Sequence, residues 1–290
     1  MSRLSPSSLG RTLGLGALPL ALACSADLEH YTTDAESGTT HALVTVDRSI
    51  LMDGSERAGA LASFVQLPAE ADARAVLDNV GLRLALPPVG QCRTDAGERP
   101  RYRGRVELVE AGAVSLLVGN TLTELAPHAF PTVTDVVSGV VYATRDVSAE
   151  PLPADADYTL RVDGSLGYFS VSRAAPEHLT AVTIGGVPLA DVTELSVAEP
   201  MDLTWGVRGD GSVASDVVWV ELANKNGTST VCTFRDELGA ATIPAGSLPG
   251  TGPTRLSLHR LRIAEFVAPA ITLGELRFDF ELQSSVSFVP

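Results

Sequence analysis

The chain has 290 residues and a formal net charge of −14 at pH 7. Because 45% of its residues are hydrophobic and only 19% are charged, the composition excludes a wholly disordered chain, and the length predicts about two domains. The excess of acidic side chains argues against nucleic acid and anionic lipid headgroups as partners, since both carry negative charge.

The N-terminus has the layout of an export signal. Arg3 and Arg11 form a positively charged region, and the apolar run 13–23 leads directly to Cys24. Such a run is shorter than the roughly 20 apolar residues that a membrane-spanning helix needs. We therefore expect residues 1–23 to be a signal peptide and the mature chain to be exported.

The last residues before Cys24 resemble the lipobox of bacterial lipoproteins. Residues 20–23 read Leu-Ala-Leu-Ala. The resemblance implies that the thiol of Cys24 is lipidated, that the signal is cut before it, and that Ser25 directs the protein to the outer membrane, on its periplasmic or its surface face. Two alternatives stay open, because residues 21–23 also form an ordinary cleavage site that releases a secreted protein, and the signal can remain as an uncleaved anchor.

The sequence contains three cysteines, Cys24, Cys92 and Cys232. Lipidation of Cys24 leaves an even number, so we expect Cys92 and Cys232 to form a disulfide in an oxidising compartment. The alternative is that both are separate buried thiols, which behave as small apolar side chains.

The mature chain before residue 176 predicts a tether and then a β-rich domain. Residues 24–40, which comprise Cys24 and a polar stretch without period, predict a lipidated, flexible tether. Residues 41–175 predict an N-terminal domain whose strands show apolar and polar residues in alternation. The clearest of these strands are 105–108, 114–118 and 158–162.

One short helix is expected near 68–80. Pro68 opens this segment, acidic residues follow in its first turns, and Gly81 closes it. This order of residues is typical of a helix with a proline at its start and a glycine after its end. The helix is expected to pack on a sheet through Val76 and Leu77.

Residues 176–290 predict a second domain made of antiparallel strands. Asn226-Gly227 marks a hairpin turn between two apolar runs, and residues 275–282 alternate strictly between acidic or basic and large apolar side chains. The apolar parity changes between Leu258 and Leu261, which predicts a β-bulge near His259 and Arg260.

The order of strands in this second domain resembles immunoglobulin and fibronectin type III sandwiches. The residues behind the resemblance are Leu203 to Trp205, the apolar strand 218–222, Cys232 and the turn-rich segment 243–248. The resemblance implies an antiparallel β-sandwich. The region lacks the second cysteine that bridges the two sheets of a true immunoglobulin domain. The fold class expected for the whole chain is therefore mainly all-β, with two β-rich domains.

Sequence motifs for chemistry are missing. The five histidines have no zinc-ligand spacing, Asp155 and Asp157 offer only two carboxylates for calcium, and the sequence contains no nucleophile-elbow, Ser-x-x-Lys or phosphate-loop motif. We therefore expect no catalytic residue, no metal and no cofactor. The histidines are His30, His41, His128, His178 and His259.

Trp219 is the aromatic residue that requires interpretation. It has the opposite parity to Val218, Val220 and Leu222, which places it on the less buried face of its strand and makes it a possible ligand contact. The alternative is that a neighbouring domain or loop covers its ring.

These observations predict a lipid-anchored envelope protein that acts by binding or scaffolding and catalyses no reaction. Its partners are expected to be the membrane, through the lipid, and an envelope protein or glycan. A carbohydrate- or peptidoglycan-binding module is one alternative, and it requires an exposed aromatic platform at Trp219. A hydrolase assembled from distant residues is the other, and it requires a pocket with a perturbed carboxylate or histidine beside a nucleophile.

Overall fold

The computed structural model describes residues 38–290, apart from residue 70 and the segments 80–84, 96–105, 134–136 and 208–215. The predicted signal peptide, Cys24 and the tether up to residue 37 lie outside the described residues. The described chain is mainly β, with one short α-helix, which confirms the predicted fold class.

Strands form most of the described chain, and most of them are antiparallel to their neighbours. In the first half they are β1 (Thr39–Ile50), β2 (Glu56–Leu67), β3 (Gln91–Asp95), β4 (Val106–Leu108), β5 (Ala113–Val118), β6 (Thr121–Val133), β7 (Val137–Ala143), β8 (Asp157–Asp163) and β9 (Phe169–Ala174). In the second half they are β10 (Thr183–Ile184), β11 (Val187–Pro188), β12 (Glu194–Ser196), β13 (Met201–Thr204), β14 (Val217–Asn224), β15 (Ser229–Arg235), β16 (Ala240–Ile243), β17 (Gly252–Ala268) and β18 (Ile271–Val289).

The first hydrophobic core lies between β1, β2 and β18 on one side and β5, β8 and β9 on the other. The long strand β6 belongs to both layers, because it pairs with β7 through one part and with β5 through another. Phe64, Tyr158 and Phe278 are fully buried in this core. Tyr158 and Phe278 lie with their ring centroids 5.1 Å apart.

The second core lies between two sheets, as in a β-sandwich. One layer is β14, β15, β17 and part of β18, and the other is the four-stranded sheet β11-β10-β13-β16. Val220 and Leu258 from the first layer are buried in the same cluster as Leu203 and Ile243 from the second. The residues that carried the resemblance to immunoglobulin-like sandwiches therefore do form two packed layers.

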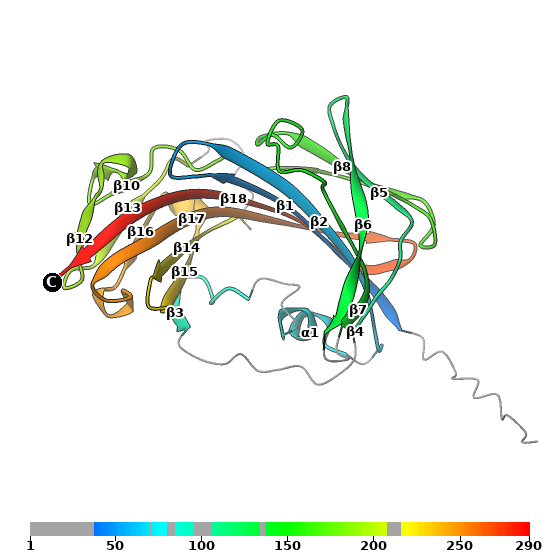
Figure 1. The fold of residues 1–290 in the computed structure, drawn as a ribbon, viewed down its shortest axis with the longest axis horizontal. Coiled ribbons are helices and arrows are strands. Elements are labelled where there is room, and N and C mark those ends of the chain that lie inside the picture. Colours follow the sequence, from blue (N-terminus) through cyan, green and yellow to red (C-terminus); the bar gives the residue numbers. More distant parts are fainter. Residues whose placement is uncertain (1–37, 70, 80–84, 96–105, 134–136, 208–215) are drawn as a thin grey trace, which may run out of the picture. The chain divides into compact units, whose positions relative to one another are not determined.

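Two long strands, β17 and β18, belong to both cores. They pair without interruption from Gly252↔Phe288 to Phe266↔Gly274, and in Figure 1 they run side by side, drawn in orange and red. Ala175 belongs to the first core and Leu179 to the second, whereas the hydrogen-bonded sheet continues past this point. Residues 36–290 form one compact unit, and the division at residue 176 stays a prediction.

A disulfide joins Cys92 of β3 to Cys232 of β15, as predicted. The two cysteines are direct partners in the antiparallel register of these strands. Because β3 pairs only with β15 among the described strands, the disulfide fixes this edge strand to the sheet. It thereby attaches a segment of the first half to the second core.

The helix α1 (Ala73–Asn79) exists but begins five residues later than Pro68. The Asp72 carboxylate accepts a hydrogen bond from the backbone N–H of Ala75, so Asp72 caps the helix and determines where it starts. Val76 and Leu77 are buried against a small cluster on β2 and β4, which agrees with the predicted packing face. Three short 3₁₀ turns complete the described elements, η1 (Leu189–Asp191), η2 (Asp236–Leu238) and η3 (Ala245–Ser247).

The β-bulge predicted near His259 and Arg260 is wrong. The β17–β18 register has a shift only between Phe266 and Ala268. The apolar parity changes because Leu258 faces the second core, whereas Leu261 packs with Trp219 on the other face of β17. Both faces of β17 are covered here, so apolar residues of either parity are buried.

Candidate functional site

One face of β18 carries apolar side chains and the other carries charged ones, as the alternation in residues 275–282 predicts. Both faces, however, are buried along part of the strand. Phe278 and Phe280 face the first core and are fully buried. The opposite face carries charged side chains, yet Glu275 and Arg277 on it are only 3% and 4% exposed. We call this second surface, carried by β1, β14, β17 and β18, the charged face. Charges in such a place require nearby partners, because burying an unpaired charge is costly.

Strand register places several polar residues next to one another on the charged face. Asp47 of β1 lies opposite Asp279 of β18, in a parallel pair. Trp219 of β14 lies opposite His259 of β17, and His259 lies opposite Glu281 of β18. Since partners in a register point to the same side of a sheet, residues more than 200 positions apart along the chain meet here.

A cavity of about 230 Å³ opens on the charged face. Its lining combines carboxylates, an imidazole, a guanidinium and two apolar walls. The lining residues are Thr45, Asp47, Trp219, His259, Leu261, Arg277 and Asp279.

His259 is held by two carboxylates. Its Nδ1 lies 2.9 Å from Oδ1 of Asp279, and its Nε2 lies 3.7 Å from Oε1 of Glu281. A carboxylate only accepts hydrogen bonds when it is ionised, so Asp279 favours the proton on Nδ1 of His259. The buried Nε2 of His259 has no hydrogen-bond partner.

Two acidic side chains near His259, Glu281 and Asp47, have shifted pKa values. Burial acts to raise the pKa of Glu281, but hydrogen bonds from Ser49 at 2.8 Å and from Gln283 at 2.8 Å, together with the charge of His259, hold it below the usual value. Loss of hydration and the negative charge of Asp279 raise the pKa of Asp47 to about 7. Asp47 still keeps exposed surface, so a proton from solvent reaches it directly.

Arg277 is the cation of the cavity wall, and Glu275 neutralises it. Its Nε donates a hydrogen bond of 2.9 Å to Oε2 of Glu275, and its Nη2 donates to the same oxygen. Both side chains are buried. The guanidinium therefore offers little uncompensated positive charge to Asp47 and Asp279.

Trp219 does not form the exposed platform that the sequence suggested. It lies on the predicted face, opposite Val218 and Val220, but only 6% of its surface is exposed. Its ring stacks on His259 with centroids 3.5 Å apart and an angle of 15° between the planes, and Leu86 packs against the same cluster. The ring is therefore buried, and the carbohydrate-platform alternative loses the exposed aromatic surface that it requires.

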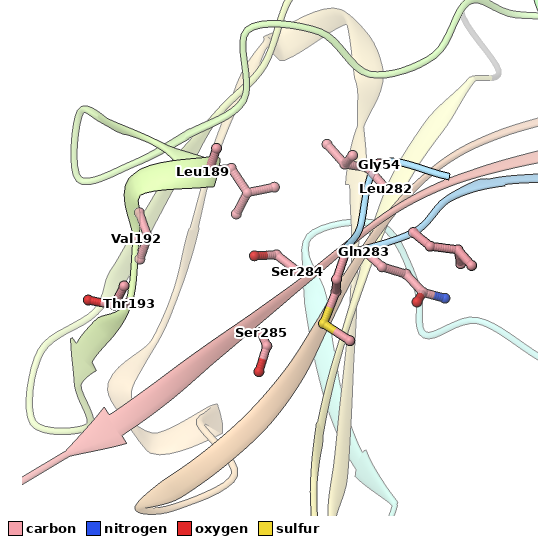
Figure 2. A pocket seen from close by; sticks show the side chains of 11 residues that line it. Gly54, Leu189, Val192, Thr193, Leu282, Gln283, Ser284 and Ser285 are labelled. Carbon is pink, nitrogen blue, oxygen red and sulfur yellow. The ribbon is translucent and has the colours of Figure 1, made fainter. Parts of the chain in front are cut away.

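A second cavity, of about 450 Å³, lies beside β18 near the second core. Figure 2 shows Leu189, Val192 and Thr193 on one side and Ser284 and Ser285 of β18 on the other. Every residue of its lining is uncharged, so the cavity offers shape and hydroxyl groups but no titratable group. The lining residues are Leu51, Met52, Gly54, Leu189, Ala190, Val192, Thr193, Leu282, Gln283, Ser284 and Ser285.

The other histidines among the described residues do not line the cavity on the charged face. The Nε2 of His178 accepts a hydrogen bond of 2.8 Å from Arg48, and burial with the charge of Arg48 lowers the pKa of His178 to about 4. Burial also lowers the pKa of His41, and His30 lies outside the described residues. Within the described segments, no three His, Cys, Asp or Glu side chains are placed to hold a metal ion. This includes Asp155 and Asp157.

Comparisons with known proteins yield only distant structural similarities. No protein-family model and no curated protein sequence matches this chain. Among solved structures, the chain is similar to the Mu homology domain of zebrafish (Danio rerio) Fcho1 with a bound Eps15 peptide, at 11% identity and a TM-score of 0.27, over 88% of this chain and 100% of that one. It is also similar to tandem immunoglobulin domains of titin, at 9% identity and a TM-score of 0.15, over 69% of this chain and 91% of that one. Neither similarity bears on what this chain binds.

The sequence interpretation missed most of this site. It selected Trp219, and it considered His259 only as one of five histidines without zinc-ligand spacing. Asp47 and Thr45 were not considered at all. The available signal was the pair of alternating patterns in residues 43–49 and 275–281, of which the first has one acidic residue on its polar face and the second has three. The sequence does not show that these two strands lie next to each other.

Proposed function

We propose that this protein is exported, anchored to the outer membrane through acyl chains on Cys24, and acts there by binding rather than by catalysis. The signal-like segment 1–23 and its lipobox resemblance support the anchor. In the described part of the chain, no helix has the length and hydrophobicity that a bilayer crossing requires.

The observation that carries the binding function is the cavity between Asp47 and Trp219. Its walls come from β1, β14, β17 and β18, and paired strands hold side chains in place more firmly than loops do. Small-molecule sites combine apolar walls with a few convergent polar groups, and this cavity has both. Its imidazole is already held between Asp279 and Glu281.

The anchor is tested by the intact mass and the fractionation of the native protein beside the Cys24→Ala variant. We expect a mass increase of a diacylglyceryl group or more and partition into the membrane, both abolished by the substitution. Ser25→Ala serves as the matched control, because it leaves the acylated cysteine in place. An unlipidated mature chain in the medium would contradict the anchor.

A hydrolase is the second candidate, and the raised pKa of Asp47 favours it. A carboxyl group that titrates near 7 beside a histidine is suited to acid–base chemistry at neutral pH. The binding proposal predicts no turnover of fluorogenic ester, glycoside or peptide substrates above background. Turnover that is lost in Asp47→Asn and kept in the exposed-strand control Asp163→Asn would establish the hydrolase instead.

A further inference from the structure

The edge of β18 that faces away from β17 has a gap in its strand pairing. Strand β1 covers this edge up to the pair Ile50↔Leu282, and β12 covers it again from the pair Glu194↔Ser287 onward. Both strands run parallel to β18. Among the described residues, no strand partner lies opposite residues 283–286 at this edge. The gap is therefore as long as one short strand, and it lies in line with β1 and β12.

The backbone of β18 presents unused hydrogen-bonding groups in this gap. The N–H of Ser287 donates to the carbonyl of Thr193 at the same edge, and the backbone groups of a strand point to opposite edges from one residue to the next. The N–H and the C=O of Ser285 therefore point into the gap. Neither has a backbone partner at this edge in the described part of the chain. An open edge of this kind is a template for pairing with another strand.

The cavity of about 450 Å³ beside β18 lies at this gap. Its lining includes the four consecutive residues 282–285 of β18. Consecutive side chains of a strand point to opposite faces, so a cavity that touches all four lies along the edge of the strand and not over one face. Figure 2 shows this stretch of β18 with Leu189, Val192 and Thr193 across the cavity from it. The volume lies within the range of ligand-binding sites.

The residues around the gap determine which side chains an added strand should carry. Leu189 and Val192 are buried in the second core, and Leu282 packs against the same core. This wall favours apolar side chains on one face of the added strand. The lining segments 51–54 and 189–194 contain three acidic residues and no Lys, Arg or His. The acidic residues are exposed, and they are Asp53, Asp191 and Glu194. Basic side chains near the ends of the added strand would complement them.

This chain itself is a poor source of the added strand. Residues 25–37 carry four acidic side chains and no Lys or Arg, so the rim of the gap would repel them. They precede the start of β1, where His41 lies opposite Leu273, and the gap begins about 33 Å further along β18 at the rise of a strand. A second copy of the chain brings the same net charge of −14. Charge therefore favours a different protein as the partner.

We propose that the gap in the edge of β18 binds an extended segment of a partner protein by strand addition, and that this segment has alternating apolar residues and basic ends. The backbone of the segment pairs with the N–H and C=O of Ser285, and its apolar face packs on Leu189 and Val192. Recognition of this kind draws affinity from main-chain hydrogen bonds and specificity from alternate side chains. The proposal goes beyond the proposed function, because this cavity shares no lining residue with the cavity at Asp47.

The test is a titration of the purified full chain into a fluorescent-labelled peptide, Lys-Val-Ser-Val-Ser-Lys with both ends capped, followed by fluorescence anisotropy. We expect saturable binding. Ser285→Pro removes the N–H that points into the gap and leaves the pairing with β17 in place, because proline is tolerated at such a position of an edge. It is expected to weaken binding by about tenfold. The matched control Ser285→Ala keeps this N–H and is expected to keep the affinity.

Two further peptides test the chemistry of the partner. The same peptide with N-methyl groups on its four central residues cannot donate backbone hydrogen bonds, and a peptide with glutamate in place of both lysines reverses the charge. We expect both to bind at least about tenfold more weakly. The N-methylated peptide also replaces Ser285→Pro if near-ultraviolet circular dichroism shows that this variant does not fold.

Several results would overturn the proposal. They are the absence of saturable binding, equal affinities of Ser285→Pro and Ser285→Ala, and equal affinities of the N-methylated or the glutamate peptide and the original one. Self-association of the chain that Ser285→Pro abolishes would also overturn it, because the gap would then belong to a second copy.

Discussion

The two faces of the β17–β18 pair bury their side chains for different reasons. On the core face, Phe278 and Phe280 exclude water with hydrocarbon alone. On the charged face, Glu275, Arg277 and His259 are as deeply buried, but each has an oppositely charged or hydrogen-bonding partner. Alternation along a strand therefore places apolar and polar side chains on opposite faces, but it does not determine which face is exposed.

The core face also contains charges where the two cores meet. Arg260 and Arg262 of β17 lie opposite Phe280 and Phe278 in the register, and each forms a buried ion pair, with Asp236 and Asp216 respectively. Arg260 also donates to the backbone carbonyls of residues 177, 178 and 206. These arginines attach the connection between the two cores to β17.

The largest expected effect is the loss of a ring from the core face. Phe278→Ala removes a fully buried side chain that contacts Tyr158, and such truncations cost about 3–5 kcal/mol of unfolding free energy. Urea unfolding measures it. The matched control is Val267→Ala, on a side chain that is 77% exposed, which is expected to cost about 0.5 kcal/mol or less. Comparable losses in both variants would contradict the assignment of the core face.

Breaking a charge pair between the cores is expected to come next. Asp236→Asn leaves the buried Arg260 guanidinium without its carboxylate, and loss of one partner from a buried pair costs about 3–5 kcal/mol. Because Arg260 keeps its hydrogen bonds to backbone carbonyls, we expect a loss of unfolding free energy near the lower end of this range. Glu237→Gln, in an exposed ion pair with Arg235, is the control and is expected to cost less than about 1 kcal/mol. A loss for Asp236→Asn as small as that of the control would show that the buried pair does not hold the junction.

Removal of the disulfide is expected to have a somewhat smaller effect. Replacing Cys92 and Cys232 by alanine frees the edge strand β3 and opens a loop with a sequence separation of 140, at a cost of about 2–4 kcal/mol. Urea unfolding of the double variant beside the oxidised protein measures it. Unchanged stability in the double variant, relative to the oxidised protein, would mean that β3 is fixed by its hydrogen bonds to β15 alone.

The smallest expected effect is an increase in stability, and it follows from a substitution of Asp47 on the charged face. Because the pKa of Asp47 is raised from 3.8 to about 7 in the folded protein, the folded state binds more protons than the unfolded state in that range. The contribution of Asp47 to the free energy of unfolding is therefore fully present below about pH 4, and it is lost as the pH rises through about 7. Asp47→Asn therefore flattens this decline and raises the melting temperature at pH 8 relative to the unsubstituted protein.

Thermal unfolding at several pH values measures the effect, with Asp163→Asn as the control for a carboxylate on an exposed strand face. A decline with pH that is the same in Asp47→Asn and in the unsubstituted protein would show that another group causes it.

Local sequence patterns predicted much of the fold. The alternation in residues 275–282 predicted the middle of strand β18 and which of its side chains face the core. Asn226-Gly227 predicted the β14–β15 hairpin, in which Gly227 has a φ of 82°. Both depend on residues close together in the chain. The disulfide was predicted from cysteine number and compartment, again without knowledge of the topology.

The candidate site was not predictable in the same way. Asp47 meets Asp279 only because β1 pairs in parallel with β18, and parallel pairing of distant strands leaves no local signature. Trp219 is buried because it stacks on His259 and packs in a cluster with Val231 and Leu261, which the parity of its own strand does not reveal. The mistaken bulge at His259 has the same origin, since burial on both faces of β17 resembles a change of parity.

The charged face forms a cavity beside Asp47, where loss of hydration and the negative charge of Asp279 raise the carboxyl pKa of Asp47. Titration of the aspartate side-chain carboxyl carbons by NMR, with Asp47 assigned by its disappearance in Asp47→Asn, measures that value. We expect a midpoint near 7. A midpoint near the ordinary value of about 3.9 would show an independently solvated carboxylate and would contradict the site.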